Sequence, residues 1–280
     1  MPRNHASSVT AASVTAVVAA RQTPAVPEVL EVELTRRGVA DLVGRTIVAV
    51  ERTDPLAVGE GVDVEVPGAR IERFDRHGKL LLVRTDGPTI GVHFGMTGRL
   101  LVDGDAVIDR LAYSPVSRDP VWDRWAVRLD DCRLVRLHDP RRLGRVRLDP
   151  DVSRLGPDVL SLRRADLAAA LAGRRAPVKA ILLDQSVIAG LGNLLADEVL
   201  WWAALSPRRP AGALTAGEVG TLAQAIRRRL PIMMRRGGSH TGELSPEVRS
   251  RPGPCRRDGT ELVRARIGGR TTVWCPSHQR

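Results

Sequence analysis

The sequence is almost without lysine, has few cysteines and contains no long apolar run. Only Lys79 and Lys179 are lysines among its 43 Lys and Arg residues. Because arginine does not reproduce a compact ammonium, each lysine is a candidate functional residue. Three cysteines are too few for a disulfide framework, which predicts a reducing, cytoplasmic compartment. No apolar run reaches the length of a membrane span, so we expect no membrane partner.

Positive charge is what the chain has in excess. Its net charge is +11 and its sequence pI is about 11.1, so a polyanion such as nucleic acid is the first partner to expect. At 280 residues and 43% hydrophobic residues, the chain is long enough to bury a full core and is predicted to form two domains.

The first 26 residues differ from the rest in composition. They are rich in Ala, Val, Ser and Thr and contain no acidic residue. Ser and Thr interrupt the apolar region and the cleavage context is poor, which argues against a signal peptide. We expect a disordered tail or a misplaced start over 1–26.

The stretch 177–210 predicts two helices separated by glycines. Pro177 suits a first helical turn, and Gly190 and Gly192 would end the first helix. Asn193 is a good N-capping residue for the second helix. A helix start of this kind leaves N–H groups that bind anions, phosphate among them, and Lys179 would lie near it. Two packed helices with an ordinary turn remain the alternative.

The preceding and following regions predict one helix and many strands. Within residues 26–47, Pro27 precedes an amphipathic helix with an acidic first turn, to which Glu28, Val29, Val32 and Glu33 belong. Alternating, β-branched segments predict antiparallel strands in a two-sheet sandwich, and they are 46–53, 69–74, 79–87, 89–102, 123–131 and 132–139. Thr215 and Glu218 form a capping-box pattern before a helix whose buried stripe is Val219, Leu222, Ile226 and Leu230.

The C-terminal tail has the spacing of a metal site. Cys255 and Asp258 are separated by two residues, and Cys275 and His278 follow with the same separation after 16 intervening residues. Two hairpins that each offer a ligand pair form a zinc ribbon, and all four residue types can bind zinc. A metal-free hairpin packed by Val263, Ile267, Val273 and Trp274 is the alternative.

Several of these segments, in order, resemble one protein family. The segments are PEVLEVE (27–33), RHGKLLLV (76–83), HFGMTG (93–98), HDPRRLGR (138–145), LLDQSVIAGLGNLLADEVL (182–200) and GGRTT (268–272). They resemble the formamidopyrimidine-DNA glycosylase / endonuclease VIII family of DNA repair enzymes, which carries a helix–two-turn–helix motif. The resemblance runs from Pro27 to His278.

The resemblance implies a role for each matching residue. Pro27 would be the nucleophile, Glu28 the acid/base, and Lys79 the hairpin lysine that reaches the lesion-side phosphate. The implied DNA contacts are Met96, Arg141, Leu143, Lys179, Asn193 and Arg270. Cys255, Asp258, Cys275 and His278 would hold one structural zinc ion.

It also implies an α+β fold and an activity. An N-terminal antiparallel β-sandwich with a leading helix would cover 27–155, a helix–two-turn–helix domain 156–238, and a zinc-ribbon finger 250–280. The activity would be that of a bifunctional glycosylase and AP lyase in base excision repair. We expect a bacterial, nucleoid-associated monomer that excises oxidised bases from damaged double-stranded DNA through a proline Schiff base and β,δ-elimination.

Four departures from the family pattern leave questions open. Leu30 replaces a proline, Leu143 replaces an aromatic residue, and Asp258 and His278 replace cysteines. Residues 239–254 are short for the loop that covers 8-oxoguanine in part of the family, so oxidised pyrimidines and abasic sites are equally plausible substrates.

The nitrogen of Pro27 is an amide in the sequence as written, and an amide cannot attack. Val26 is what an internal GTG codon encodes, so we hypothesise that translation starts there and that removal of the initiating Met exposes Pro27. Proteolytic trimming is an alternative. So are a catalytically inactive sensor of damaged or abasic DNA and a zinc-ribbon RNA-binding protein.

Overall fold

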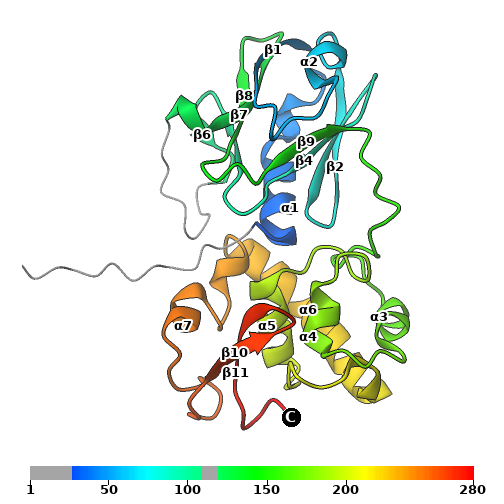
Figure 1. The fold of residues 1–280 in the computed structure, drawn as a ribbon, viewed down its shortest axis with the longest axis vertical. Coiled ribbons are helices and arrows are strands. Elements are labelled where there is room, and N and C mark those ends of the chain that lie inside the picture. The colour runs from blue at the N-terminus through cyan, green and yellow to red at the C-terminus, as the bar shows by residue number, and fades with distance from the viewer. Residues whose placement is uncertain (1–26, 109–118) are drawn as a thin grey trace, which may run out of the picture.

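The computed structural model describes residues 27–108 and 119–280, so the expectation for 1–26 lies outside the described residues. The chain forms a β-sheet half and a helical half, with helix α1 (Val29–Gly38) at the junction between them (Figure 1). The C-terminal β-hairpin belongs to the helical half. This α+β arrangement confirms the predicted fold class.

The β-sheet half is the predicted antiparallel sandwich. Its strands are β1 (Ile47–Thr53), β2 (Ile71–His77), β3 (Leu80–Thr85), β4 (Ile90–His93), β5 (Arg99–Val102), β6 (Asp105–Ala106), β7 (Asp123–Leu129), β8 (Leu134–His138) and β9 (Arg145–Leu148). One sheet has the order β1-β7-β8-β5-β6 and the other β2-β3-β4-β9. Their inner faces enclose one apolar core that includes Leu81, Ile90, Leu129 and Leu137. Strands β6 and β9 and the short helix α2 (Val62–Glu65) were not predicted.

Helix α1 packs into both halves of the molecule. Val29 and Leu30 belong to the core of the helical half, whereas Val32 belongs to the core of the sandwich. The apolar residues of this helix are therefore buried on two sides, and each side packs against a different half of the molecule. Arg76 of β2 strengthens the junction by binding Glu33 of α1 and Asp158 of the connection between the halves.

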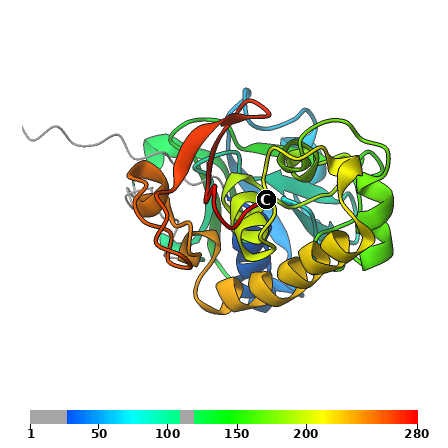
Figure 2. The same ribbon diagram turned by 90° about the horizontal axis from the view of Figure 1, so that it is seen from below.

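The helical half has helix α5 (Asn193–Trp202) at its centre. Its other helices are α3 (Arg164–Leu171), α4 (Val178–Leu183), α6 (Ala216–Arg235) and α7 (Pro246–Ser250). Seen from below, α6 runs along one edge of the domain beside α5 (Figure 2). Among the described residues, no helix is both long and apolar enough to cross a membrane.

Two details of these helices bear on the sequence predictions. The predicted capping box at the start of α6 is present, with Glu218 N donating to Thr215 Oγ1 and Thr215 N donating to Glu218 Oε2. Helix α4 ends at Leu183, however, and not at Gly190. The residues between them form a turn, in which the Gln185 side chain bonds the backbone of Leu183, Gly190 and Leu191.

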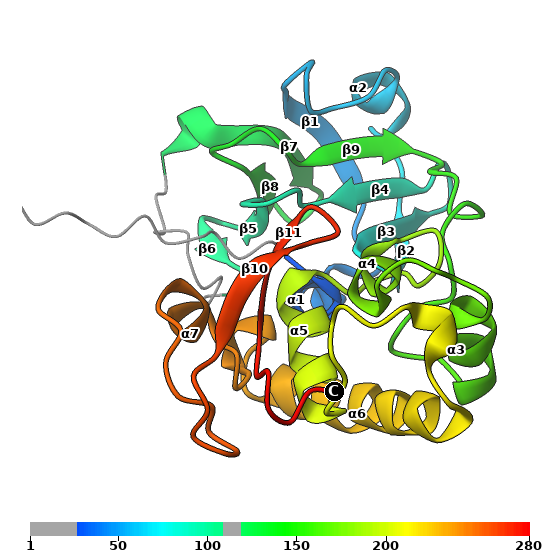
Figure 3. The ribbon, with the colours of Figure 1, turned by 60° about the horizontal axis from the view of Figure 1, so that its bottom comes forward.

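The last element is a two-stranded hairpin, β10 (Val263–Ile267) and β11 (Arg270–Trp274). Figure 3 shows this hairpin lying along α5, with its tip directed toward the sandwich. A Cβ atom at Gly268, in the tip, would lie only 2.9 Å from the Ala180 Cβ atom of α4. The fold thus brings the hairpin tip against α4.

Candidate functional site

The first turn of α5 is occupied by the carboxylate of Glu28. Gly192 N and Leu195 N donate to its Oε2 at 2.7 and 3.1 Å, and Leu194 N donates to its Oε1 at 2.8 Å. Gly192 is required at this point because a Cβ atom there would lie 2.2 Å from the Glu28 Cδ atom. An anion at a helix N-terminus is stabilised by the free N–H groups and the helix dipole.

This arrangement corrects the expectation for the helix start. We expected Asn193 to cap α5 and the helix start to offer its N–H groups to phosphate. Gly192 is the cap residue instead, Asn193 is the first helical residue, and three N–H groups are used by Glu28. The Asn193 Oδ1 atom has no hydrogen-bond partner within the described part of the chain. The side chain of Asn193 is thus open to a ligand.

Pro27 and Glu28 are fixed at the junction of the two halves. Pro27 is buried, and Glu28 has no exposed surface. Glu28 N donates to Glu31 Oε2 at 2.9 Å, and Ser239 N donates to Glu31 Oε1 at 2.6 Å. Glu31 therefore ties the first turn of α1 to the segment after α6. Burial raises the pKa of Glu28, and the ammonium of Lys79 opposes that rise.

Lys79 and Arg270 come to the same place from distant elements. Lys79 lies in the β2–β3 turn and is half-buried, and Arg270 is exposed at the start of β11. Desolvation lowers the pKa of Lys79, the Glu28 carboxylate raises it, and the Arg270 guanidinium lowers it further. Lys79 thus faces the buried Glu28 carboxylate and has a second cation, Arg270, near it, which favours an anionic ligand over the site.

Lys179 does not join this group, which corrects its expected role. Its side chain is completely buried, and its Nζ atom lies 2.6 Å from Asp197 Oδ1, 2.7 Å from Thr272 Oγ1 and 3.1 Å from the Thr271 carbonyl oxygen. The ammonium donates hydrogen bonds to the two threonine oxygens, and its charge is paired with the Asp197 carboxylate. Burial lowers the pKa of Lys179 to about 8 despite Asp197.

Asp197 and Lys179, together with Arg249, form a buried cluster that attaches the hairpin to α5. Besides Lys179, Asp197 binds the guanidinium of Arg249 and accepts a hydrogen bond from Val273 N at 3.0 Å. Arg249 in turn donates to the Thr271 carbonyl oxygen at 2.7 Å. Lys179 therefore positions the strand that begins with Arg270, and no local sequence pattern distinguishes this role from a phosphate contact.

Met96, Arg141 and Leu143 lie together at one end of the sandwich. Met96 is half-buried in the β4–β5 loop, while Arg141 and Leu143 are exposed in the β8–β9 loop, Leu143 to 38%. The two loops touch, because a Cβ atom at Gly95 would lie 2.4 Å from the Leu143 carbonyl carbon.

His93, which sequence reasoning missed, links these loops to Lys79. It ends β4 opposite Leu80 of β3 and Arg145 of β9. Desolvation, then the ammonium of Lys79 and the guanidinium of Arg145, lower the pKa of His93. Its place beside Leu80 became visible only from the strand register.

The four predicted metal ligands are brought together at the base of the hairpin. One donor atom each from Cys255, Asp258, Cys275 and His278 lies within 4.8 Å of the others. Such a set of two sulfurs, one imidazole nitrogen and one carboxylate oxygen could hold a metal ion, and it suits zinc.

The imidazole of His278 is already oriented for this task. Its Nε2 atom lies 3.3 Å from the Trp201 carbonyl oxygen, so the hydrogen on Nε2 is donated there and Nδ1 faces Cys255 and Asp258. A second hydrogen bond that fixes the tautomer is the usual support of a histidine ligand. The Trp201 ring also packs edge-on against His278 at 5.4 Å between centroids.

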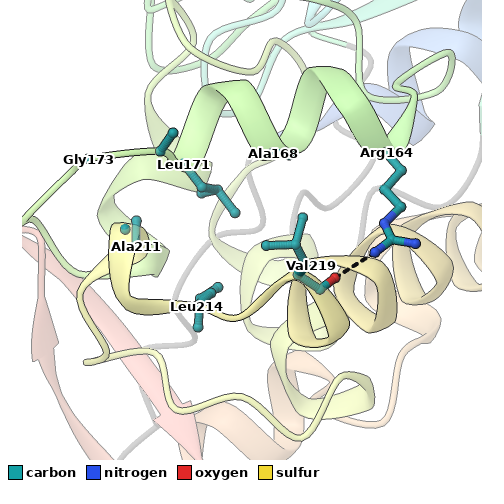
Figure 4. A pocket seen from close by; sticks show the side chains of 10 residues that line it. Arg164, Ala168, Leu171, Gly173, Ala211, Leu214 and Val219 are labelled. Atoms are coloured by element: carbon teal, nitrogen blue, oxygen red, sulfur yellow. Dashed lines mark hydrogen bonds between the residues drawn. The ribbon is translucent and has the colours of Figure 1, made fainter.

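A separate hollow of about 350 Å³ lies between α3 and the start of α6. Figure 4 shows Leu171, Ala211, Leu214 and Val219 around it, with Arg164 bonded across one end to the Ala216 carbonyl oxygen. None of the site residues described above lines it. It forms no part of the candidate site.

Comparisons with known proteins agree with this architecture. The family model described as "Formamidopyrimidine-DNA glycosylase N-terminal domain" matches residues 26–146, and "Formamidopyrimidine-DNA glycosylase H2TH domain" matches 155–244. A formamidopyrimidine-DNA glycosylase of Xanthomonas oryzae pv. oryzae is 38% identical over 281 residues, which covers 91% of this chain and 100% of that protein.

Solved structures are similar over the same extent. The MutM (Fpg) protein of Thermus thermophilus has a TM-score of 0.73 and 34% identity, covering 90% of this chain and 98% of that one. The Fpg of Lactococcus lactis, in a complex with DNA containing an abasic site, has a TM-score of 0.75 and 25% identity, covering 90% and 99%.

The matched domains and the site define a DNA glycosylase with the helix–two-turn–helix architecture. The chain belongs to the formamidopyrimidine-DNA glycosylase family.

Proposed function

We propose that this protein is a bifunctional DNA glycosylase and AP lyase that excises oxidised bases from damaged duplex DNA through the amine of Pro27. The observation that carries the proposal is the buried Glu28 carboxylate next to Pro27, held by three N–H groups of α5 and faced by Lys79. A proton-transfer group beside an amine nucleophile is what Schiff-base chemistry needs.

The working form would begin at Pro27. The nitrogen of Pro27 must be a free secondary amine to attack a carbon atom, and an α-amine has a pKa of about 7.7–8.0, so much of it is unprotonated at neutral pH. The family model begins at residue 26, one residue before Pro27. This alignment supports initiation at Val26 followed by removal of the initiating Met.

In the proposed reaction the Pro27 nitrogen forms a bond to C1′ of the flipped nucleotide as the bond from C1′ to the base breaks, and the departing base takes the proton that the nitrogen loses. Glu28, whose pKa is raised by burial, protonates O4′ as the sugar ring opens and the iminium forms. The iminium acidifies the C2′ hydrogen. Loss of this proton expels the 3′ phosphate, and a second elimination expels the 5′ phosphate.

DNA binding would use the charges around this centre. Lys79, Arg270 and the side chain of Asn193 would contact phosphates near the lesion, whereas Lys179 would act through the hairpin. Flipping a nucleotide costs a few kcal/mol, and Met96, Arg141 and Leu143 would offset it by filling the gap. The complex of the Lactococcus lactis protein with abasic DNA supports this class of substrate.

The finger would hold one structural zinc ion through Cys255, Asp258, Cys275 and His278. Bound zinc would stabilise the fold at the base of the hairpin and take no part in the reaction. Its contribution to DNA binding would come through the placement of Arg270.

A second candidate is a sensor of damaged DNA without catalysis. The observation that favours it is the amide bond between Val26 and Pro27 in the sequence as written. Both candidates predict binding to damaged duplexes, and only the first predicts cleavage.

Mass spectrometry of the N-terminus of the natural protein separates the two candidates: Pro27 as the first residue favours the enzyme, and an intact bond between Val26 and Pro27 favours the sensor. A panel of duplexes then tests the activity itself. Each duplex carries an abasic site, an oxidised pyrimidine or 8-oxoguanine, and is incubated with protein that begins at Pro27. We expect strand cleavage at the abasic site and at one or more of the oxidised bases. Tight binding with no cleavage of any duplex would favour the sensor.

A further inference from the structure

Asp139, directly after β8, is completely buried beneath the gap-filling residues. The Oδ2 atom of its carboxylate accepts Leu143 N at 2.7 Å and Gly144 N at 2.6 Å, and its Oδ1 atom accepts Arg141 N at 3.2 Å. The turn that carries Arg141 and Leu143 is therefore wound around one carboxylate. Hydrogen bonds from N–H groups to a buried carboxylate are stronger than neutral ones.

The same carboxylate also holds the second loop. The Thr97 hydroxyl donates to Asp139 Oδ1 at 2.5 Å, and Thr97 directly follows Met96. Gly95 has a φ of 59° and lies so close to Leu143 that no side chain would fit there. The backbone of the Met96 loop thus contacts the β8–β9 loop, and the Thr97 side chain ties the Met96 loop to Asp139.

The outer side of the β8–β9 loop is held independently. Arg142 has a φ of 56°, a conformation that costs free energy in a residue with a side chain. Its Nε atom lies 2.8 Å from Asp54 Oδ2, and Asp54 also binds Arg124. Arg124 Nε donates to the Asp139 carbonyl oxygen at 2.8 Å. The loop is braced on both sides before any DNA is present.

We propose that Asp139 is a positioning residue that sets Met96, Arg141 and Leu143 as one preformed wedge. The inference rests on the proposed function, since the wedge matters only if a nucleotide leaves the stack. Loops whose backbone is already ordered lose less conformational entropy when they insert into DNA. Without the carboxylate, the two loops would have to be ordered by the DNA, and base flipping would become less favourable.

The test uses two variants and a matched control, all beginning at Pro27. Asp139→Asn replaces an acceptor for four donors by an amide that itself carries two donors, so it cannot satisfy the N–H groups. Thr97→Val keeps the shape and removes only the link to the Met96 loop. Asp151→Asn is the control, because Asp151 accepts Ser153 N at 2.9 Å in an exposed turn away from the wedge.

Two quantities are measured for each protein. The first is the fluorescence of 2-aminopurine placed opposite an abasic-site analogue, which rises when this orphaned base is unstacked. The second is the rate of cleavage at an abasic site in a duplex divided by the rate in a single strand, where no partner base must be displaced. The ratio cancels any general loss of active protein.

We expect Asp139→Asn to abolish most of the fluorescence rise and to lower the rate ratio about 10- to 100-fold, the size expected when buried donors lose a charged acceptor. Thr97→Val should lower the ratio to a smaller extent, and Asp151→Asn should match the parent. An unchanged ratio and fluorescence rise in Asp139→Asn would overturn the inference. Parent protein that cleaves neither substrate would instead refute the proposed function.

Discussion

At the scale of single residues, Glu28 combines two roles that are usually separate. It holds the start of α5, and in the proposed mechanism it moves the proton during ring opening. A glutamine at this position can accept with only one atom, so Glu28→Gln should lower stability by about 1–3 kcal/mol. It should also reduce base excision about 100- to 10,000-fold, because the acid/base is lost. Thermal unfolding and single-turnover excision measure the two effects.

Glu198→Gln is the matched control for Glu28→Gln. Glu198 is also buried, its pKa is also raised by burial, and it too accepts three hydrogen bonds, from Trp202 Nε1, Glu243 N and Leu244 N. It lies further along α5, where no reaction is proposed. Loss of excision in the control as large as in Glu28→Gln would show that helix capping alone accounts for the effect.

At the scale of elements, the two lysines have different roles. Lys79 lies in the β2–β3 turn at the site, and Lys179 is buried against the hairpin. Lys79→Ala and Arg270→Ala should each reduce the slope of log K against log salt by about one, because each removes a phosphate contact. Lys179→Met should change this slope by clearly less than one and should lower the stability instead. The reason is that the ammonium of Lys179 binds oxygens inside the protein. Salt titrations of binding to an abasic duplex test all three.

Equal slope changes in the three variants would contradict the assignment of Lys179. A slope that stays unchanged for both Lys79→Ala and Arg270→Ala would remove these residues from the phosphate contacts.

The finger element gives a prediction about metal removal. We expect about one zinc per chain after mild purification, since four donors complete a structural site. Because a carboxylate is a harder ligand than a thiolate, this site should lose zinc to chelators more readily than a four-cysteine ribbon. Chelation should change the fluorescence of Trp201, which packs on His278, and weaken DNA binding while the sandwich stays folded.

The double variant Asp258→Cys and His278→Cys should bind metal more tightly than the parent protein and should keep its activity. Metal-free protein that binds DNA at full strength would show that the Asp197 cluster alone holds the hairpin.

Sequence alone predicted those features that local patterns encode. The leading helix, the Thr215 capping box, most strands and the metal spacing all depend on residues close together in the chain. The cap of α5 by Glu28 spans more than 160 positions, from residue 28 to residues 192–195, and no periodicity reveals it. The same holds for Lys179 and Asp139, whose burial and partners depend on how separate loops meet.

At the scale of the whole molecule, α1 is what makes two domains act as one. It contributes to both apolar cores, and its first turn carries Pro27, Glu28 and Glu31 to the junction. The sandwich brings Lys79 to this junction, and the helical half brings the α5 start and Arg270. The proposed nucleophile, acid/base and phosphate contacts therefore meet where the two halves join.

The central claim is that the nitrogen of Pro27 forms the covalent intermediate, and borohydride trapping tests it most directly. Protein beginning at Pro27 and protein with residues 1–26 intact are incubated with an abasic duplex and borohydride, and the adduct is located by mass spectrometry. We expect an adduct on Pro27 in the first protein and none in the second, because an acylated proline cannot form a Schiff base. Equal adduct in both proteins, or an adduct on another residue, would contradict the account.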